Sequence, residues 1–285
     1  MKKLTKNHLI YGIGILVSVA ILAAFTALIA VPSVKRAAVK IAKNNLYETQ
    51  YSFPEGAVIT AKNGLANNEK NSLIYVRAAL QKDVDCFEID LCFDEKGKPF
   101  VAENADKITD NSMPFEYLIS FISEEINSSA QRKRLINIHL EDASEIGEVT
   151  EIITRYEMDD FCFFTGVNVN QASYIRQNSS IPFYLDYEID KSKADDPDYA
   201  ISVVNAISNS GAIGINCSAD NFSNTLASMI KESWLKISFY DVETELEIIA
   251  ALRFSPNQII TRDPQLVRSI LTEWNAKAPS SDLAY

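Results

Sequence analysis

The chain has 285 residues, with 27 Lys and Arg against 38 Asp and Glu, and a formal net charge of −11. Seven of the basic residues precede Glu48, the first acidic residue, so the chain from Glu48 onward carries 20 minus 38, or −18. Such a charge repels nucleic acid and other polyanions, which excludes nucleic acid as a partner and suits a site that recruits a cation.

An apolar segment near the N-terminus, Leu9 to Val31, contains 23 residues without a full charge. At about 1.5 Å of rise per residue, a helix of this length spans roughly 30 Å of hydrocarbon. The segment therefore predicts a single-pass transmembrane helix at the cell membrane, with the lipid bilayer as a partner. A cleaved signal peptide is the alternative, although its apolar core is normally about 7–15 residues long.

Basic residues flank this segment on both sides, so the flanking charge does not decide its orientation. They are Lys2, Lys3 and Lys6 before it, and Lys35, Arg36, Lys40 and Lys43 after it. A signal anchor with a short N-terminal tail most often places the next domain outside, so we expect an extracytoplasmic domain. The stretch from Lys35 to Phe53 is compatible with a juxtamembrane helix or stalk, which Pro54 ends.

Beyond Gly56, short β-rich apolar runs alternate with longer runs of period near 3.6. The predicted strands are Ala57–Ala61, Val84–Leu91, Leu135–Leu140, Phe161–Thr165, Pro182–Tyr187, Ala212–Asn216, Leu235–Tyr240 and Gln258–Thr261. The predicted helices include Leu73–Gln81, Met113–Ile126, Ala143–Tyr156, Tyr199–Ser208, Phe222–Lys231 and Thr244–Leu252. Lys98–Ala102 follows a turn and is predicted to form a hairpin with the second strand.

Eight βα steps in about 220 residues favour a closed (β/α)8 barrel of the TIM type, an α/β fold, over an open sheet. The expected organisation is a basic tail at 1–8, the transmembrane helix at 9–31, the stalk at 32–55, the barrel at 56–274 and a flexible tail at 275–285. The cysteines lie in apolar runs without metal-type or redox-type spacing, and we expect them in the core. They are Cys86, Cys92, Cys162 and Cys217.

Polar side chains on two predicted strands are expected to converge inside the barrel. The period of two places Glu88 and Asp90 on one face of the second strand, near its C-terminal end, where such barrels carry their reactive groups. On the third strand, His139 and Glu141 point to the same axis. These four residues predict a site for a hard divalent cation. The alternative is a structural ion-pair cluster in which Lys62 replaces the metal.

The order of the motifs resembles that of the glycerophosphodiester phosphodiesterase family, over Ala57 to Leu271. Ile59–Gly64 stands at the family's Ala-His-Arg-Gly motif, Lys70–Leu73 at its Glu-Asn-Thr motif and Asp85–Asp90 at its Asp-x-x-Glu-x-Asp motif. Gly97–Asn104 then stands at the family's Gly-x-Pro-Val-Val-x-His-Asp motif and Ile138–Glu141 at its Ile-Glu-Ile-Lys motif. Near the C-terminus, Phe239–Val242 stands at the Trp-Thr-Val motif and Ile259–Pro264 at the Ile-Thr-Asp-x-Pro motif. The resemblance implies a TIM barrel that binds a glycerophosphodiester.

The family's chemistry implies Ca²⁺ or Mg²⁺ on three acidic residues, with two histidines as acid and base while the substrate's glycerol hydroxyl attacks phosphorus. Imidazole suits this task because its pKa lies near the working pH. Here Lys62 and Glu103 stand at the histidine positions, Asn63 at a phosphate-binding arginine, and His139 at the third metal carboxylate. The only other histidine is His8, so no realignment restores two imidazoles.

Two functions remain open. The first is a membrane-anchored phosphodiesterase of lipid metabolism with altered activity, in which Lys62 contacts phosphate and Glu103 acts as an acid after burial raises its pKa. The second is a pseudoenzyme that holds a ligand or partner at the membrane, with Lys62 neutralising Glu88 and Asp90. We expect loss of the ordinary activity.

Overall fold

The structure, a computed structural model, describes residues 31–32, 34–43, 56–65, 68–82, 84–128 and 134–277. The predicted transmembrane helix lies outside these residues except for Val31, as do the basic tail at 1–8 and most of the predicted stalk. Within the described residues, no helix is both long enough and apolar enough to cross a membrane.

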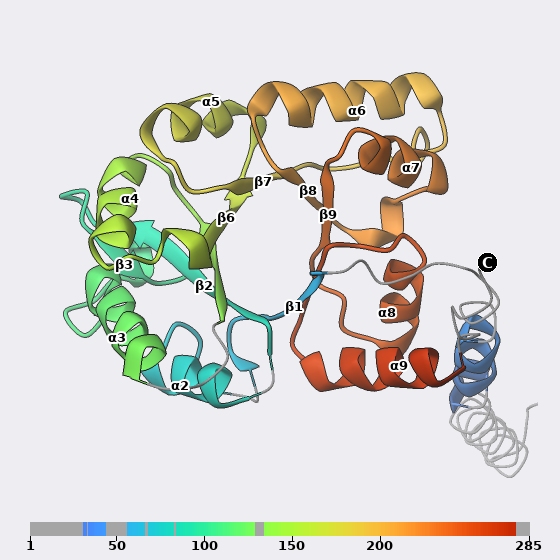
Figure 1. The fold of residues 1–285 in the computed structure, drawn as a ribbon, viewed down its shortest axis with the longest axis horizontal. Coiled ribbons are helices and arrows are strands. Elements are labelled where there is room, and N and C mark those ends of the chain that lie inside the picture. The colour runs from blue at the N-terminus through green and yellow to red at the C-terminus, as the bar shows by residue number, and fades with distance from the viewer. Residues whose placement is uncertain are drawn as a thin grey trace, which may run out of the picture.

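Eight parallel strands form a closed barrel in the described part of the chain (Figure 1). They are β1 (Val58–Ala61), β2 (Cys86–Phe93), β5 (Leu135–Leu140), β6 (Cys162–Val167), β7 (Phe183–Asp186), β8 (Gly214–Cys217), β9 (Lys236–Phe239) and β10 (Gln258–Thr261). β1 closes the ring by pairing with both β10 and β2. Each predicted strand overlaps an observed one, so the predicted TIM-type barrel is confirmed.

The strength of pairing varies around the ring. β2 and β5 share six residue pairs, from Cys86–Leu135 to Leu91–Leu140. β1 and β2 share only two, Thr60–Cys86 and Ala61–Phe87. The closure of the barrel is therefore short, like the junctions β6–β7 and β9–β10, which also share two residue pairs each.

An antiparallel insertion follows β2. β3 (Pro99–Val101) pairs with β2, which confirms the predicted hairpin, and β4 (Met113–Pro114) pairs with β3. The next helix, α3 (Phe115–Ser128), begins two residues later than expected, because Met113 pairs with Val101 instead of entering the helix.

Helices surround the barrel (Figure 1). They are α2 (Leu73–Gln81), α3, α4 (Ile146–Arg155), α5 (Val169–Asn178), α6 (Pro197–Ser210), α7 (Asn224–Glu232), α8 (Glu245–Leu252) and α9 (Pro264–Lys277), with short 3-10 turns η2 (Ala105–Lys107), η3 (Asp159–Phe161) and η4 (Ala219–Asn221). α9 continues three residues past the expected end of the domain at 274. Sequence analysis predicted neither α5 nor α9.

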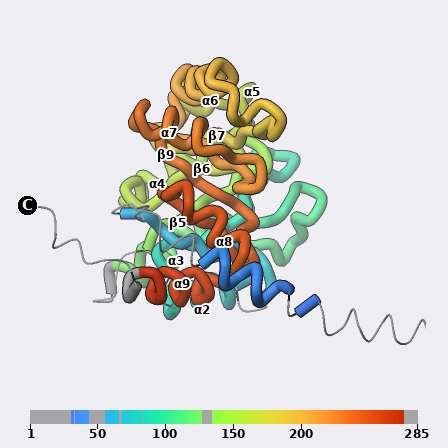
Figure 2. Tube along the Cα trace, turned by 90° about the vertical axis from the view of Figure 1, so that its right-hand side faces the viewer, coloured from blue at the N-terminus to red at the C-terminus, as the bar shows by residue number. Residues whose placement is uncertain are grey.

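Residues 34–43 form a further helix, which lies beside α8 and α9 (Figure 2). Lys43 fixes its end there, because its ammonium lies 2.5 Å from Glu245 Oε1 and 2.8 Å from Glu273 Oε2. This part of the predicted stalk is therefore helical and contacts the barrel domain.

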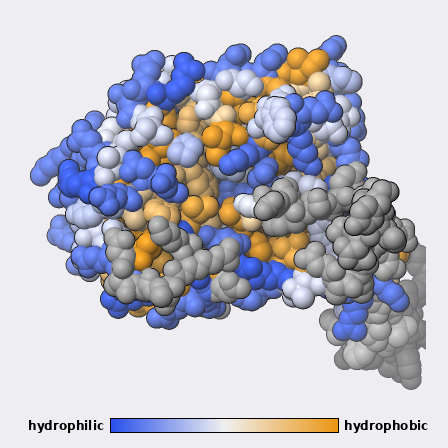
Figure 3. All heavy atoms as spheres, in the orientation of Figure 1, coloured by the Kyte–Doolittle hydropathy of each residue, from blue (hydrophilic) through white to orange (hydrophobic). Residues whose placement is uncertain are grey.

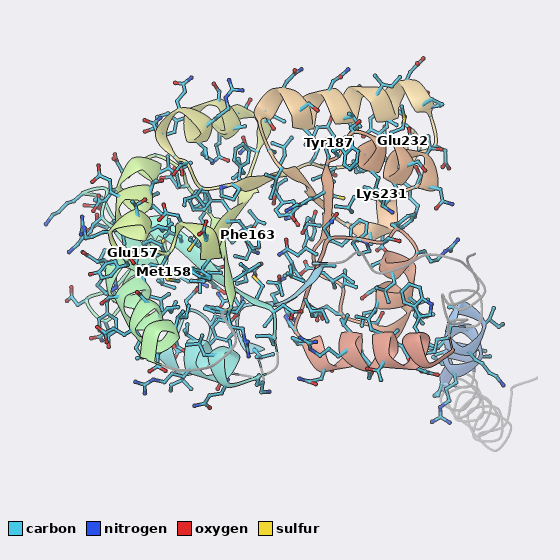
Figure 4. The ribbon with its side chains drawn as sticks, viewed as in Figure 1. Glu157, Met158, Phe163, Tyr187, Lys231 and Glu232 are labelled. Atoms are coloured by element: carbon cyan, nitrogen blue, oxygen red, sulfur yellow. The ribbon has the colours of Figure 1, made fainter. Side chains whose placement is uncertain are left out.

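The main apolar core lies between the strands and the helices. Phe87, Ile89 and Ile138 face outward from the barrel interior, because they alternate along their strands with the inward-facing residues. All three are fully buried in this core. A separate small cluster of Cys86, Phe163 and Tyr184 fills one end of the barrel interior, and Figure 4 shows Phe163 on the inner side of β6. Hydrophilic side chains dominate the rim in Figure 3, with apolar ones gathered nearer the centre. All four cysteines are buried and free, as expected.

Asp85, the first acidic residue of the β2 motif, has a structural position. Its carboxylate accepts a hydrogen bond from the backbone N–H of Ile59 at 3.1 Å and one from the Arg268 guanidinium at 3.1 Å. It precedes β2 at the N-terminal end of the strand, whereas Asp90 is the fifth of the eight strand residues. Asp85 therefore joins β1, β2 and α9.

Candidate ligand site at the barrel mouth

A cavity of about 370 Å³ opens at the C-terminal ends of the strands. Its walls carry Lys62, Lys70, Glu88, Asp90, Glu103, His139, Glu141, Asp186, Asn216, Tyr240, Asp241 and Ile260. The predicted convergence of polar groups from β2 and β5 is therefore confirmed. Asn63, predicted to bind substrate, is not among the lining residues and is only 3% exposed.

Glu88 is the most deeply buried acid of the cavity, with 7% of the residue exposed. Burial raises its pKa from 4.5 to about 7, with repulsion from Asp90 adding to the shift, while His139 and Lys62 oppose it. Its Oε2 accepts a hydrogen bond from the Asn137 side chain at 3.2 Å. A carboxyl group with a pKa near neutrality exists in both protonation states at physiological pH.

Asp90 is held by two asparagine side chains. Its Oδ2 accepts hydrogen bonds from Asn63 Nδ2 at 2.8 Å and Asn71 Nδ2 at 3.0 Å. Asn63 also donates to Asn71 Oδ1 at 2.7 Å. Asn63 therefore positions Asp90 instead of occupying the open cavity, and its amide is already used within the protein.

Asn71 is a site residue that sequence analysis did not select. Its backbone has φ of 54°, a left-handed conformation that Asn tolerates better than most residues. In this position its side chain reaches Asp90 and also accepts from the Asp90 backbone N–H at 3.0 Å. The signal in the sequence was an asparagine immediately before Ser72, which caps α2.

Lys62 forms its salt bridge with Asp241, which follows β9. Among the ion pairs of the described residues, Lys62 has none with Glu88 or Asp90, so the predicted ion-pair cluster with these two acids is wrong. The Lys62 side chain is 21% exposed and extends from the end of β1 to Asp241 beyond the end of β9. Its charge still lowers the pKa of Glu88, although it forms no ion pair with that carboxylate in the described residues.

Glu103 lies between two lysines. Its carboxylate contacts Lys70 Nζ at 2.5 Å and also pairs with Lys107. The hydrogen bond from Lys107, followed by that from Lys70, lowers the pKa of Glu103 from 4.5 to about 2. The expectation that burial would raise this pKa is wrong, because 27% of the side chain is exposed and two cations stabilise its charged form.

His139 lies on the wall next to Thr165. Its Nδ1 is 3.3 Å from Thr165 Oγ1, and its Nε2 is 3.8 Å from Glu141 Oε1. Thr165 in turn donates to Asn137 Oδ1 at 2.8 Å, which connects the imidazole to the Glu88 environment. Within the described part of the chain, no group of three or more His, Cys, Asp or Glu side chains is arranged to hold a metal ion.

The opposite wall contains polar residues that sequence analysis missed. Asp186 accepts from Asn216 Nδ2 and from the Gly166 backbone N–H, both at 3.0 Å, and Ser238 donates to Asn216 Oδ1 at 2.8 Å. Burial raises the pKa of Asp186, although these hydrogen bonds and the charge of His139 oppose the shift. Asp186, Asn216 and Ser238 are polar residues among apolar ones in β7, β8 and β9. This pattern was the sequence signal that could have predicted side chains facing the barrel interior.

Tyr75 supports the site from α2. Its buried hydroxyl lies 3.0 Å from Ala61 O and 2.8 Å from Glu88 O, where β1 and β2 meet. We expect Tyr75→Phe to lower the free energy of unfolding by about 1–2 kcal/mol, because the buried hydroxyl that donates to these carbonyls is lost. Urea unfolding measures this effect. The control is Tyr174→Phe, whose hydroxyl bonds Ser144 O at the surface and should cost less than about 0.5 kcal/mol.

The closed barrel, with a polar mouth at the C-terminal strand ends, places this chain among TIM-barrel proteins whose site lies on that face. No family model matches the chain, and no curated protein sequence matches it. Solved structures with the same fold include glycerophosphodiester phosphodiesterases, and the likeness, at low sequence identity, shows a shared fold.

Three of these structures illustrate the likeness. The enzyme from Agrobacterium tumefaciens has 12% identity and a TM-score of 0.57, with 75% of this chain and 99% of that chain covered. One from Parabacteroides distasonis has 11% identity and a TM-score of 0.56, with 85% and 93% covered. A phosphodiesterase from Oleispira antarctica, solved with the product sn-glycerol-3-phosphate, has 14% identity and a TM-score of 0.53, with 75% and 96% covered.

Proposed function

We propose that this chain is a membrane-anchored member of the glycerophosphodiester phosphodiesterase family that has lost the ordinary two-histidine reaction and binds a glycerophosphodiester-type ligand. One observation carries the proposal. The residues at the family's histidine positions, Lys62 and Glu103, are both committed to ion pairs, with Asp241 and with two lysines respectively. A proton carrier needs a pKa near the working pH, and a carboxyl of pKa about 2 remains charged at neutral pH.

The ligand class is supported by the fold and the cavity. The related Oleispira phosphodiesterase binds sn-glycerol-3-phosphate, and Lys62 and Lys70 supply cations at the mouth of this barrel. A phosphate that entered would compete with Asp241 and Glu103 for these ammonium groups. Binding is therefore expected to be weak and to depend on salt.

The proposal includes the segment Leu9–Val31 as the bilayer anchor, because of its length and its lack of charged residues. It also includes an extracytoplasmic barrel, because a signal anchor with a short N-terminal tail most often places the next domain outside. A divalent cation, Ca²⁺ or Mg²⁺, is also proposed. Glu88, Asp90, His139 and Glu141 line one cavity and would be its ligands. No three such side chains of the described residues are arranged to hold a metal as they stand, so binding would require them to draw together. Such a cation would add positive charge beside the buried Glu88.

The test of lost activity uses the purified full chain in detergent with glycerophosphocholine and Ca²⁺, Mg²⁺ or Mn²⁺. We expect turnover equal to that of the Asp90→Ala variant with each ion. Metal-dependent hydrolysis that disappears in Asp90→Ala would instead establish a working phosphodiesterase with a rebuilt site.

The test of binding follows the melting temperature of the same preparation with sn-glycerol-3-phosphate. A ligand that binds the folded state raises this temperature with concentration. We expect the increase for the wild type, a smaller one for Lys62→Ala, and an unchanged one for the exposed control Lys96→Ala. No increase at any concentration would contradict the ligand assignment. The proposed cation is tested by the melting temperatures of the wild type and of Asp90→Ala, each measured with Ca²⁺ and with a chelator. We expect Ca²⁺ to raise the melting temperature of the wild type more than that of Asp90→Ala.

A further inference from the structure

A second cavity, of about 620 Å³, lies between the helix of residues 34–43 and the start of α8. One wall carries Lys35, Arg36, Lys40 and Lys43, and the other includes Glu245 and Leu246. We call this cavity the stalk groove. It is separate from the cavity at the barrel mouth, with which it shares no lining residue.

Part of the positive charge of the stalk groove is uncompensated. Lys43 is neutralised, because it pairs with Glu245 and Glu273 and only 19% of its side chain is exposed. Lys35, Arg36 and Lys40 are exposed, and the ion pairs found among the described residues include none of them. Three cations that have no ion pair within the described residues therefore line the groove. With Lys43, Glu245 and Glu273 counted, the lining carries a net charge of +2 on a chain that is otherwise strongly acidic, which favours an anionic ligand.

The same helix exposes apolar side chains. Val34 is 67% exposed and Ile41 61%, and Leu246 in the groove is 37% exposed. Cations beside exposed apolar residues on one helix are typical of segments that lie at a membrane interface. Val34 and Ile41 do not line the groove, but they lie next to Lys35 and Lys40 in the same helix. A small soluble anion in the groove would gain nothing from these exposed apolar neighbours, whereas a membrane lipid would.

The helix that lines the stalk groove directly follows the proposed membrane anchor in the sequence, which indicates a ligand from the membrane. Lys35 is four residues beyond Val31, the last residue of the proposed anchor, so it lies within about 14 Å of the end of that segment. Resting on that proposed anchor, we propose that the stalk groove binds the phosphate head group of an anionic membrane lipid. Lys35, Arg36 and Lys40 contact the head group, and Val34 and Ile41 enter the interface.

The experiment places the full chain in lipid nanodiscs of phosphatidylcholine, either alone or with added phosphatidylserine, and measures amide hydrogen exchange of residues 34–43. We expect exchange to slow by about five-fold or more with phosphatidylserine, since one basic residue near an anionic surface already contributes about that factor. The triple variant K35Q/R36Q/K40Q should lose this protection. The control K96Q/K98Q/K191Q removes three exposed lysines elsewhere and should keep it.

Four results would overturn the inference. Equal exchange in both kinds of disc, or protection that persists in K35Q/R36Q/K40Q, would show that the groove does not select anionic lipid. The same protection in phosphatidylcholine discs after addition of inorganic phosphate would identify a soluble anion as the ligand. If the chain elutes apart from the discs, the anchor itself fails and the inference fails with it, which separates the two proposals.

Discussion

Replacing Glu88 with Gln is expected to stabilise the protein at alkaline pH and to have little effect at acidic pH. Below about pH 4.5 the carboxyl is protonated in both the folded and unfolded states. Between pH 4.5 and about 7 only the unfolded state releases the proton, so the stability of the wild type falls as pH rises. Above pH 7 the full cost of burying the charge is present, about 3 kcal/mol from a shift of this size.

Urea unfolding at pH 5, 7 and 8.5, with EDTA present, measures this difference. The amide in Glu88→Gln keeps an oxygen that can accept the hydrogen bond from Asn137 but carries no titratable proton. Position 88 should therefore add no pH dependence to the free energy of unfolding of Glu88→Gln between pH 5 and 8.5. The exposed control Glu95→Gln should follow the wild type at every pH. A constant difference between Glu88→Gln and wild type across the three values would contradict the burial of an uncompensated carboxylate.

Replacing Gly166 with Ala is expected to lower the free energy of unfolding by about 2–5 kcal/mol. Gly166 has φ of 78°, a region that costs other residues about 1–2 kcal/mol, and an added Cβ would lie 2.3 Å from Leu140 O. That contact forces apart β5 and β6, and overpacking of this kind costs typically 1–3 kcal/mol more. The shift would also displace the Gly166 N–H from Asp186.

Gly147→Ala is the matched control, because Gly147 lies in α4 and the nearest atom to its added Cβ is Asn178 O at 3.9 Å. Alanine has the higher helix propensity, so this variant should be as stable as the wild type or up to about 1 kcal/mol more stable. Thermal and urea unfolding of both variants provide the comparison. Equal stability of Gly166→Ala and wild type would show that β5 and β6 are not so closely placed.

The strands could be predicted because each is a short apolar run between a turn and a helical segment. The inward direction of Glu88 and Asp90 followed from the period of two along β2. α5 was missed because only Ala172 and Ile175 are buried, which leaves little apolar periodicity. Its capping box, formed by Asn168 and Gln171, was the better signal.

The partners of the charged site residues could not be predicted. Lys62 and Asp241 are 179 residues apart, and Lys70 and Glu103 are 33 apart. Sequence patterns give the face of a strand on which a side chain lies, but loops at the strand ends decide which opposite charges meet. The pKa of Glu103 was therefore predicted in the wrong direction, whereas the membership of Glu88, Asp90, His139 and Glu141 in one cavity was predicted correctly.

The two-pair junction between β1 and β2 has a consequence for how the barrel moves. A seam held by few backbone bonds opens at a lower free-energy cost than the six-pair junction between β2 and β5. Beyond the last paired residues of this junction, Asn63 follows β1 and donates to Asp90 of β2, and Asn71 donates to the same carboxylate from the turn before α2. Local separation of β1 and β2 would therefore release Asp90 and loosen the ligand site.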